Sequence, residues 1–156
     1  MDKRIRRFRT GDEAILRTLF FDTIRNVNRR DYTEEQVRAW APEDYEPEHW
    51  AHRMRELNPF VCEVDGEIAG YADLQSSGYI DHFFVSKNFQ RRGVGTSLFE
   101  RIEAEARARQ LKELSADVSI TARPFFERFG FAVIRQQQVT INDVVLTNFR
   151  MVRKIS

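Results

Sequence analysis

Residues 85–96 have the types and the spacing that bind a phosphate group. A predicted strand ends at Val85, a basic loop follows, and Gly93 and Gly95 open a long predicted helix. Glycine lets the backbone approach a ligand closely, and the free amides at a helix N-terminus attract anions. Residues 82–99 contain no acid, so the positive end of this helix is left open, close to three cations, Lys87, Arg91 and Arg92. The segment therefore predicts an anion site.

Two other phosphate motifs fit these residues less well. A Walker-type loop needs Gly-Lys followed by Ser or Thr, where this chain has Val94-Gly95-Thr96. A dinucleotide fingerprint needs a third glycine, where Leu98 stands, and places its glycines directly after the strand. The remaining alternative is a glycine-rich turn with solvated arginines.

Two ordered signatures resemble one family. The run Gln90-Arg91-Arg92-Gly93-Val94-Gly95 resembles the pyrophosphate-binding signature of the GNAT superfamily, the acetyl-CoA-dependent N-acetyltransferases. Residues 122–131, Ala-Arg-Pro-Phe-Phe-Glu-Arg-Phe-Gly-Phe, resemble its second signature, Ala-x-x-Phe-Tyr-x-x-x-Gly-Phe. Residues 115–131 and Ala39-Trp40-Ala41 are also similar to the bacterial YafP-type branch. The resemblance extends over the chain and implies a single GNAT-like domain, residues 1–156, with acetyl-CoA as acetyl donor.

The resemblance implies a cofactor held in a V-shaped gap between two splayed parallel strands, residues 79–85 and 114–118. The backbone of Phe83 and Val85 would pair with the pantetheine arm as an added strand does. The amides of residues 91–96 would hold the pyrophosphate. The cofactor-binding residues expected in all are Phe83, Val85, Gln90, Arg91, Arg92, Gly93, Val94, Gly95, Thr96, Ser119, Phe125 and Phe126.

The chain departs from the family pattern at two of these positions. The common Tyr, often invoked to protonate the leaving thiolate, falls on Phe126, which has no proton to donate. The common Asn at the end of the preceding strand falls on Ser119, whose side chain is shorter. Phe125 and Phe126 would lie beside the thioester, with core packing as the alternative for either ring.

Asp81 is the candidate catalytic base, because an attacking amine must lose a proton and several GNAT enzymes have a base at the positions that match Tyr79 or Asp81. In one continuous strand, residues 79, 81, 83 and 85 share a face, which would put His82 on the opposite face in a packing or surface role. A buried acid paired with an arginine is the alternative for Asp81. Tyr79 would orient the amine or supply the missing acid, or only line the cleft.

The acceptor site is expected between Tyr32 and Trp50 and at the last hairpin. Tyr32 and Trp40 are the candidate substrate-binding residues, as part of an aromatic lid that also includes Tyr45 and Trp50. A nearby acid would attract the amine, the candidates being Glu43, Asp44 and Glu46. Ordinary amphipathic packing is the alternative, and the sequence does not identify the acceptor.

Hydrophobic periodicity and turn signals position these residues. They predict an α+β, three-layer fold with a mixed, mostly antiparallel central sheet of about seven strands flanked by helices. Strands are expected at 5–8, 60–64, 68–74, 79–85, 114–118, 131–139 and 144–152. Helices are expected from Thr10, from a capping box at Thr33 and Gln36, over 48–57, over 94–110 and between Pro124 and Gly130.

The composition fits one ordinary globular domain. Arginine makes up 21 of the 25 basic residues, yet 24 acids leave a net charge of +1, so the chain is not a polycation and no nucleic-acid partner is expected. The lone Cys62 excludes an internal disulfide and a thiolate zinc cluster, and no metal is expected. A cytoplasmic monomer or homodimer without membrane contact is the expectation. A small-molecule or peptide amine is the expected acceptor, and a non-catalytic acyl-CoA sensor is the alternative function.

Overall fold

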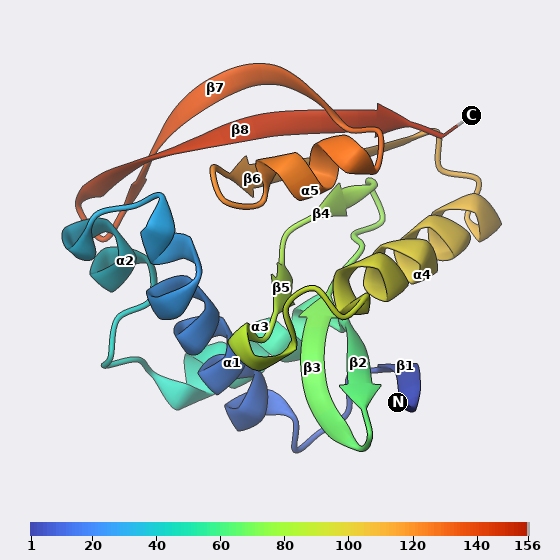
Figure 1. Cartoon of the computed structure of the whole chain (residues 1–156), viewed down its shortest axis with the longest axis horizontal. Coiled ribbons are helices and arrows are strands. Elements are labelled where there is room, and N and C mark those ends of the chain that lie inside the picture. Colours follow the sequence, from blue (N-terminus) through green and yellow to red (C-terminus); the bar gives the residue numbers. More distant parts are fainter. Residues whose placement is uncertain (156) are drawn as a thin grey trace.

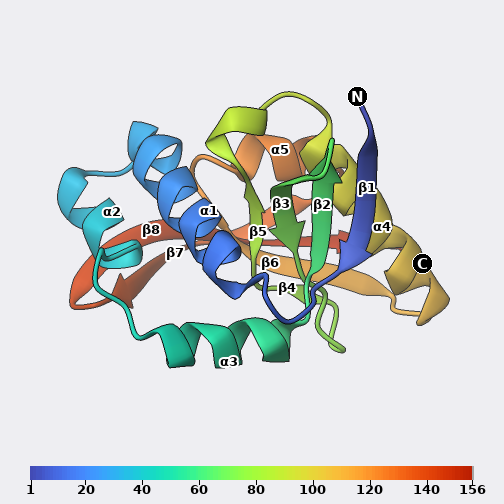
Figure 2. The ribbon, with the colours of Figure 1, turned by 90° about the horizontal axis from the view of Figure 1, so that it is seen from below.

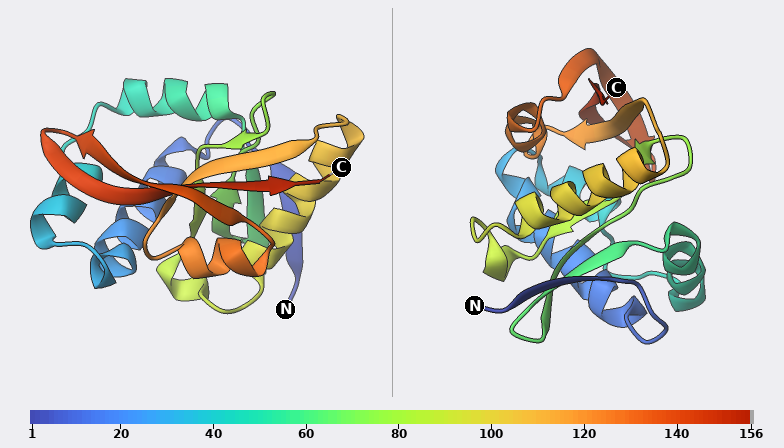
Figure 3. Two further views of the ribbon diagram at one scale, coloured as in Figure 1. Left: turned by 90° about the horizontal axis from the view of Figure 1, so that it is seen from above. Right: turned by 90° about the vertical axis from the view of Figure 1, so that its right-hand side faces the viewer.

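The computed structural model describes residues 1–155, whose strands form two four-stranded sheets that diverge from each other (Figure 1). The predicted fold class is confirmed, with one correction: the strands do not form a single central sheet of about seven. The final strands lie on one side of the molecule, and the first sheet lies on the other side with the N-terminus (Figure 3).

The first sheet has the order β1-β2-β3-β5, and every neighbouring pair is antiparallel. Asp65 and Gly66 both have positive φ, which is the backbone of a tight hairpin turn between β2 and β3. The strands are β1 (Lys3–Arg7), β2 (Phe60–Val64), β3 (Glu67–Ala72) and β5 (Phe83–Val85).

The second sheet has the order β4-β6-β8-β7, in which only β4 and β6 run parallel. Asn142 and Asp143, both with positive φ, turn the predicted final hairpin. The strands are β4 (Tyr79–Ile80), β6 (Glu113–Ser119), β7 (Ala132–Ile141) and β8 (Val144–Lys154).

Helices cover both faces of the first sheet, as the alternation of β2 requires (Figure 2). Val61 packs with α1 and α3, whereas Phe60 and Cys62 join the core under α4. The helical elements are α1 (Glu13–Asn26), η1 (Asn28–Arg30), α2 (Glu34–Trp40), α3 (Pro47–Leu57), η2 (Lys87–Phe89), α4 (Val94–Ala108) and α5 (Arg123–Arg128). The predicted capping box is present: Thr33 Oγ1 accepts from Gln36 N, and Gln36 Oε1 accepts from Thr33 N.

The strand predicted over 79–85 is two strands, and this prediction was wrong. β4 joins the second sheet and β5 joins the first, with a break at Asp81 and His82. The cause is Asp73, a fully buried carboxylate that follows β3. Its Oδ1 accepts the backbone amides of both Asp81 (2.8 Å) and His82 (2.7 Å). Because both amides point to one acceptor, the alternation of a regular strand is lost where the sheets separate.

Replacing Asp73 by Asn is expected to stabilise the fold near neutral pH, because Asn keeps a carbonyl oxygen for both amides without a buried charge. Burial raises the pKa of Asp73 from 3.8 to about 6. The folded protein therefore binds this proton more tightly than the unfolded chain does, and the Asp73 contribution makes stability rise as pH falls from above 6 towards 4. Asp73 changes the free energy of unfolding by at most about 3 kcal/mol over this pH range.

Chemical denaturation near pH 5 and pH 7.5 checks this expectation, with Asp73→Ala as the control (conditions chosen about the shifted pKa). The advantage of Asp73→Asn over the wild type should be larger at the higher pH. Asp73→Ala also lacks the titrating carboxyl and leaves two amides without their acceptor, so it should be less stable than Asp73→Asn by about 1–3 kcal/mol at both pH values. An unchanged pH dependence in Asp73→Asn would show that another group titrates.

Candidate active site at the divergence of the two sheets

A cavity of about 910 Å³ lies between the diverging strands. Its lining comes from β4, β5 and β6, from the loop before α4, from α5, and from α1, η1, α2, β7 and β8. The pairing of β4 with β6 ends at Ile80 and Ala116, but β6 continues to Ser119. Beyond that point β5 and β6 have no ladder between them, so the predicted V-shaped gap is present.

The odd-numbered residues of β5 present their backbone groups to this gap. Towards β3, the carbonyl of His82 accepts from Asp73 N (3.2 Å) and the amide of Ser86 donates to Ala69 O (2.8 Å). Backbone groups of alternate residues point to opposite edges of a strand, so those of Phe83 and Val85 point away from β3. This is the edge that an added strand would need.

One of these backbone groups is already bonded. The carbonyl of Val85 accepts from Gln90 Nε2 (2.7 Å) and from Thr23 Oγ1 (3.1 Å). Gln90, expected from the sequence to bind the cofactor, therefore holds the strand that borders the gap. Its own contact with a cofactor stays a prediction.

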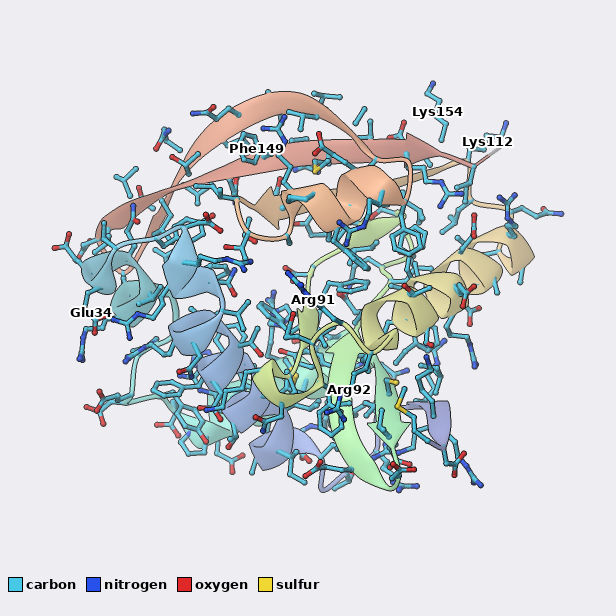
Figure 4. All side chains as sticks on the ribbon, viewed as in Figure 1. Glu34, Arg91, Arg92, Lys112, Phe149 and Lys154 are labelled. Carbon is cyan, nitrogen blue, oxygen red and sulfur yellow. The ribbon has the colours of Figure 1, made fainter. Side chains whose placement is uncertain are left out.

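The loop before α4 has the open amides that the sequence predicts. Arg91 and Gly93 have positive φ of 61° and 79°, and Gly93 caps the helix without a side-chain hydrogen bond. The first turn of α4 contains no acid. Figure 4 shows Arg91 and Arg92 on this loop, where both side chains are exposed. Val94 is buried, so only its backbone is available to a ligand, whereas Thr96 is exposed.

A further cation beside this loop could not be predicted from the sequence. Lys3 Nζ, on β1, donates to the carbonyl of Gly93 at 3.2 Å. The two residues are far apart in the chain, and no local pattern pairs them. Lys3 adds positive charge next to the helix N-terminus.

Gly95 makes a close approach to Phe125. A Cβ at residue 95 would lie 3.0 Å from two atoms of the Phe125 ring. Phe126 is 3% exposed and packs against Phe83 and Phe131, with ring centroids 5.5 Å and 5.0 Å away. Phe126 therefore packs in the core, which was the alternative to cofactor contact. Phe125 and Phe126 also both line the cavity. Their contact with a cofactor stays a prediction.

Ser119 has a structural task. Its Oγ accepts from the amide of Ala122 (3.0 Å), in the turn that begins α5, and from Asn28 Nδ2 (3.3 Å). The sequence did not single out Asn28, which is buried and brings an amide to the gap from η1. Thr121 Oγ1, also at the cavity, is buried without a hydrogen-bond partner among the described residues.

Asp81 lines the cavity and forms an ion pair with Arg53 of α3. Burial raises the pKa of this carboxyl, and Arg53 opposes the rise. The pairing with an arginine is the alternative considered for this residue. Since Asp81 also lines the cavity, the pairing does not remove it as a candidate base.

Tyr79 donates its hydroxyl proton to Asp117 Oδ2 (2.9 Å). Asp117 also contacts Arg150 Nε (3.0 Å) and accepts from Gln137 Nε2 (2.9 Å). Burial and the neighbouring Asp117 raise the pKa of Tyr79, so its hydroxyl stays protonated. A proton held by Asp117 is less suited to a leaving thiolate, which weakens Tyr79 as the missing acid.

His82 has the packing role expected from the sequence, since its ring contacts Phe20, Tyr71 and Phe84. The break in the strand nevertheless puts His82 as well as Asp81 among the residues that line the cavity, so the two do not simply face opposite sides of one strand. The Tyr71 hydroxyl lies 3.0 Å from His82 Nδ1. Burial lowers the pKa of His82 to about 3, and Arg53 adds to the effect, so the imidazole is neutral near pH 7.

Tyr32 and Trp40 line the cavity, with ring centroids 5.5 Å apart in an edge-to-face contact. The other predicted parts of the acceptor site do not: Tyr45, Trp50 and the acids Glu43, Asp44 and Glu46 are absent from the described lining. Trp50 instead donates to Glu13 O (2.8 Å), and Tyr45 stacks on Arg17. Both residues therefore have partners outside the cavity lining.

Within residues 1–155 no three of the side chains His, Cys, Asp and Glu come together to hold a metal ion. None of the helices in this part of the chain combines the length and the hydropathy needed to cross a membrane. Cys62 is buried in β2, where burial raises the pKa of its thiol.

Two divergent sheets with an open helix N-terminus at the gap between them define an acyltransferase-like fold. The family model of the acetyltransferase (GNAT) domain matches residues 28–153. The chain belongs to the GNAT acetyltransferase family, and it is an N-acetyltransferase whose acetyl donor is acetyl-CoA.

Relatives span most of the chain. The uncharacterised N-acetyltransferase YafP of Escherichia coli K12 is 32% identical over 148 residues, covering 94% of this chain and 93% of YafP. A GCN5-related N-acetyltransferase from Rhodopseudomonas palustris superposes with a TM-score of 0.94 at 28% identity, covering 99% and 97% of the two chains. PaiA N-acetyltransferase of Thermoplasma acidophilum, solved with coenzyme A, shares the fold with a TM-score of 0.76 at 17% identity, over 99% and 100%.

Proposed function

We propose that this N-acetyltransferase acts on a primary amine, which attacks acetyl-CoA directly within a ternary complex. The observation that carries the proposal is the continuity of the cavity, which reaches from the α4 N-terminus past the open edge of β5 to Asp81 and Trp40. A donor lying along β5 and an acceptor lying against α1 and α2 would meet beside the break at residues 81–82. No covalent enzyme intermediate is needed in such an arrangement.

One end of the cavity suits the donor, and the other end suits the acceptor amine. The amides of the α4 N-terminus suit the pyrophosphate, and Arg91 and Arg92 add positive charge. At the other end Asp81 accepts a proton from the amine, directly or through water, so that the nitrogen attacks in its neutral form. The cavity-facing amide of Phe83 or Val85 donates to the thioester oxygen as negative charge develops there.

The departing thiolate has no dedicated acid in this proposal. Phe126 carries no proton, and the Tyr79 hydroxyl is bonded to Asp117. A thiol has an ordinary pKa of about 8.5, so the thiolate leaves readily and takes a proton from solvent. A positioned acid raises the reaction rate roughly 10²–10⁴-fold, so we expect turnover without one to be slower by about this factor.

Acetyl-CoA binding and thiol release together test the proposal. Acetyl-CoA and CoA should both raise the melting temperature, by the equivalent of about 2.7 kcal/mol at a hundred times the dissociation constant. Free thiol should then appear with at least one member of a panel of primary amines. Stabilisation by an oligonucleotide and not by CoA would contradict the assignment.

A non-catalytic acyl-CoA sensor, the alternative left open by the sequence, would require the Arg53 pairing of Asp81 and the buried Phe126 to abolish turnover. Stabilisation by acetyl-CoA, with no thiol release over the whole amine panel, would favour the sensor.

The buried Cys62 suits a reducing compartment, and the cytoplasm stays the predicted location.

A further inference from the structure

The acceptor half of the cavity has an apolar wall. It is built by the helices that precede β2 and by the end of the last hairpin, and its main residues are Phe20, Tyr32, Trp40, Ile141 and Leu146. Phe20, Tyr32 and Leu146 are each less than one-tenth exposed. Of these five side chains only Tyr32 has a hydroxyl, and that hydroxyl already has two hydrogen-bond partners. It donates to Thr147 O (2.6 Å) and accepts from Ile120 N (3.0 Å).

The carboxylates that line the cavity are both neutralised. In the described part of the chain these are Asp81, paired with Arg53, and Asp117, which contacts Arg150 Nε at 3.0 Å. Among the other charged lining residues, Arg30 lies at the end of η1, whereas Arg91 and Arg128 lie on the loop before α4 and on α5, at the donor end. A substrate with several ammonium groups would therefore meet no unpaired carboxylate. An unpaired charge in apolar surroundings is strongly disfavoured.

His82 completes the acceptor end without adding charge. The Tyr71 hydroxyl is fully buried and needs an acceptor, which His82 Nδ1 provides at 3.0 Å, so the ring proton belongs on Nε2. His82 is among the residues that line the cavity. The neutral ring stacks on Phe20, 5.7 Å between centroids, and does not repel an incoming amine.

We propose that the acceptor is a monoamine with an apolar body, which packs against Phe20, Trp40 and Ile141 while its nitrogen lies at Asp81. The inference rests on the proposed transferase function and narrows its substrate class. Polyamines and other polycations are excluded as preferred acceptors, because the wall offers their additional charges no partner.

Hexylamine and hexamethylenediamine are a matched pair for the test, since they differ only in a second amino group at the far end. With acetyl-CoA and the wild-type enzyme, kcat/KM measured by thiol release should be at least about tenfold higher for hexylamine. Equal or better turnover of the diamine would overturn the proposal.

Ile141→Glu places a carboxylate on the apolar wall and should raise the relative kcat/KM of the diamine at least about fivefold. Ile134→Glu is the control, because Ile134 lies on the same strand, β7, but is 53% exposed and does not line the cavity. This control should keep the wild-type preference. An equal change in both variants would contradict the placement of the acceptor body.

Binding separates this inference from the transferase function. If neither amine releases thiol, titration calorimetry of each into the CoA-loaded protein replaces the kinetic comparison. Tighter binding of hexylamine without turnover would support the apolar site and contradict the transferase. No binding of hexylamine, or tighter binding of the diamine, would overturn the inference itself.

Discussion

Gly93→Asp should reduce the affinity for coenzyme A at least about a hundredfold and leave a folded protein. The new carboxylate would lie beside the open amides of the α4 N-terminus, where the pyrophosphate is expected, and would repel it. Gly93 has a φ of 79°, so any side chain also strains the turn that aims these amides. The only atom that a Cβ would meet within 4 Å is Lys3 Nζ, the end of a flexible side chain. Isothermal titration with CoA measures the loss.

Gly66→Asp is the matched control, because Gly66 also has a positive φ, of 84°, with open space around it and a position in the distant β2–β3 turn. It should cost similar stability and keep CoA affinity. Gly95→Asp is a poorer probe, since its Cβ would lie 3.0 Å from the Phe125 ring and would disturb packing as well as binding. Unchanged affinity in a folded Gly93→Asp protein would refute the phosphate site.

Asp81→Asn should lower kcat by roughly 10²–10⁴-fold, the usual contribution of a positioned base, with CoA affinity retained. A base must be deprotonated to act, so in the wild type the rate should fall as pH falls through the raised pKa of Asp81. The variant should lose this acidic limb. Profiles of kcat and of kcat/KM against pH, over the range in which the protein stays folded, measure both effects.

Arg53→Gln provides the second variant for this assignment. Arg53 lowers the pKa of Asp81, so its removal should move the acidic limb to higher pH. The Arg53 side chain is 52% exposed, which makes the replacement compatible with folding. A limb that stays in place in Arg53→Gln, or full activity in Asp81→Asn, would leave a water chain as the base.

Local signals in the sequence predicted the parts of the site that depend on neighbouring residues. The two glycines and the lack of acid before Glu100 indicated the open helix start, since backbone geometry and the helix dipole act within one turn. The same holds for the Thr33 capping box and the Asn142 turn.

The features that the sequence did not predict depend on contacts between residues far apart in the chain. The break at 81–82 depends on the Asp73 carboxylate, which no periodicity in residues 79–85 reveals. For that reason the sequence did not predict that His82, besides packing in the core, also lines the cavity. Asn28 and Lys3 reach the site from elements far away in the chain. Arg17 and Arg25 bind the carbonyls of Pro42 and Ala41, and the acids that follow are not in the cavity lining.

The Asp73 hydrogen bonds also bear on how this enzyme can be diversified. The backbone amides of residues 81 and 82 bond to Asp73 and mark the point at which the sheets part. The His82 ring is packed among aromatic side chains and contacts the Tyr71 hydroxyl, whereas the Asp81 side chain is free to vary without loss of its amide hydrogen bond. A library randomised at residue 81 alone, with proline omitted and with Asp73 and His82 kept, should therefore yield mostly folded proteins that differ in turnover.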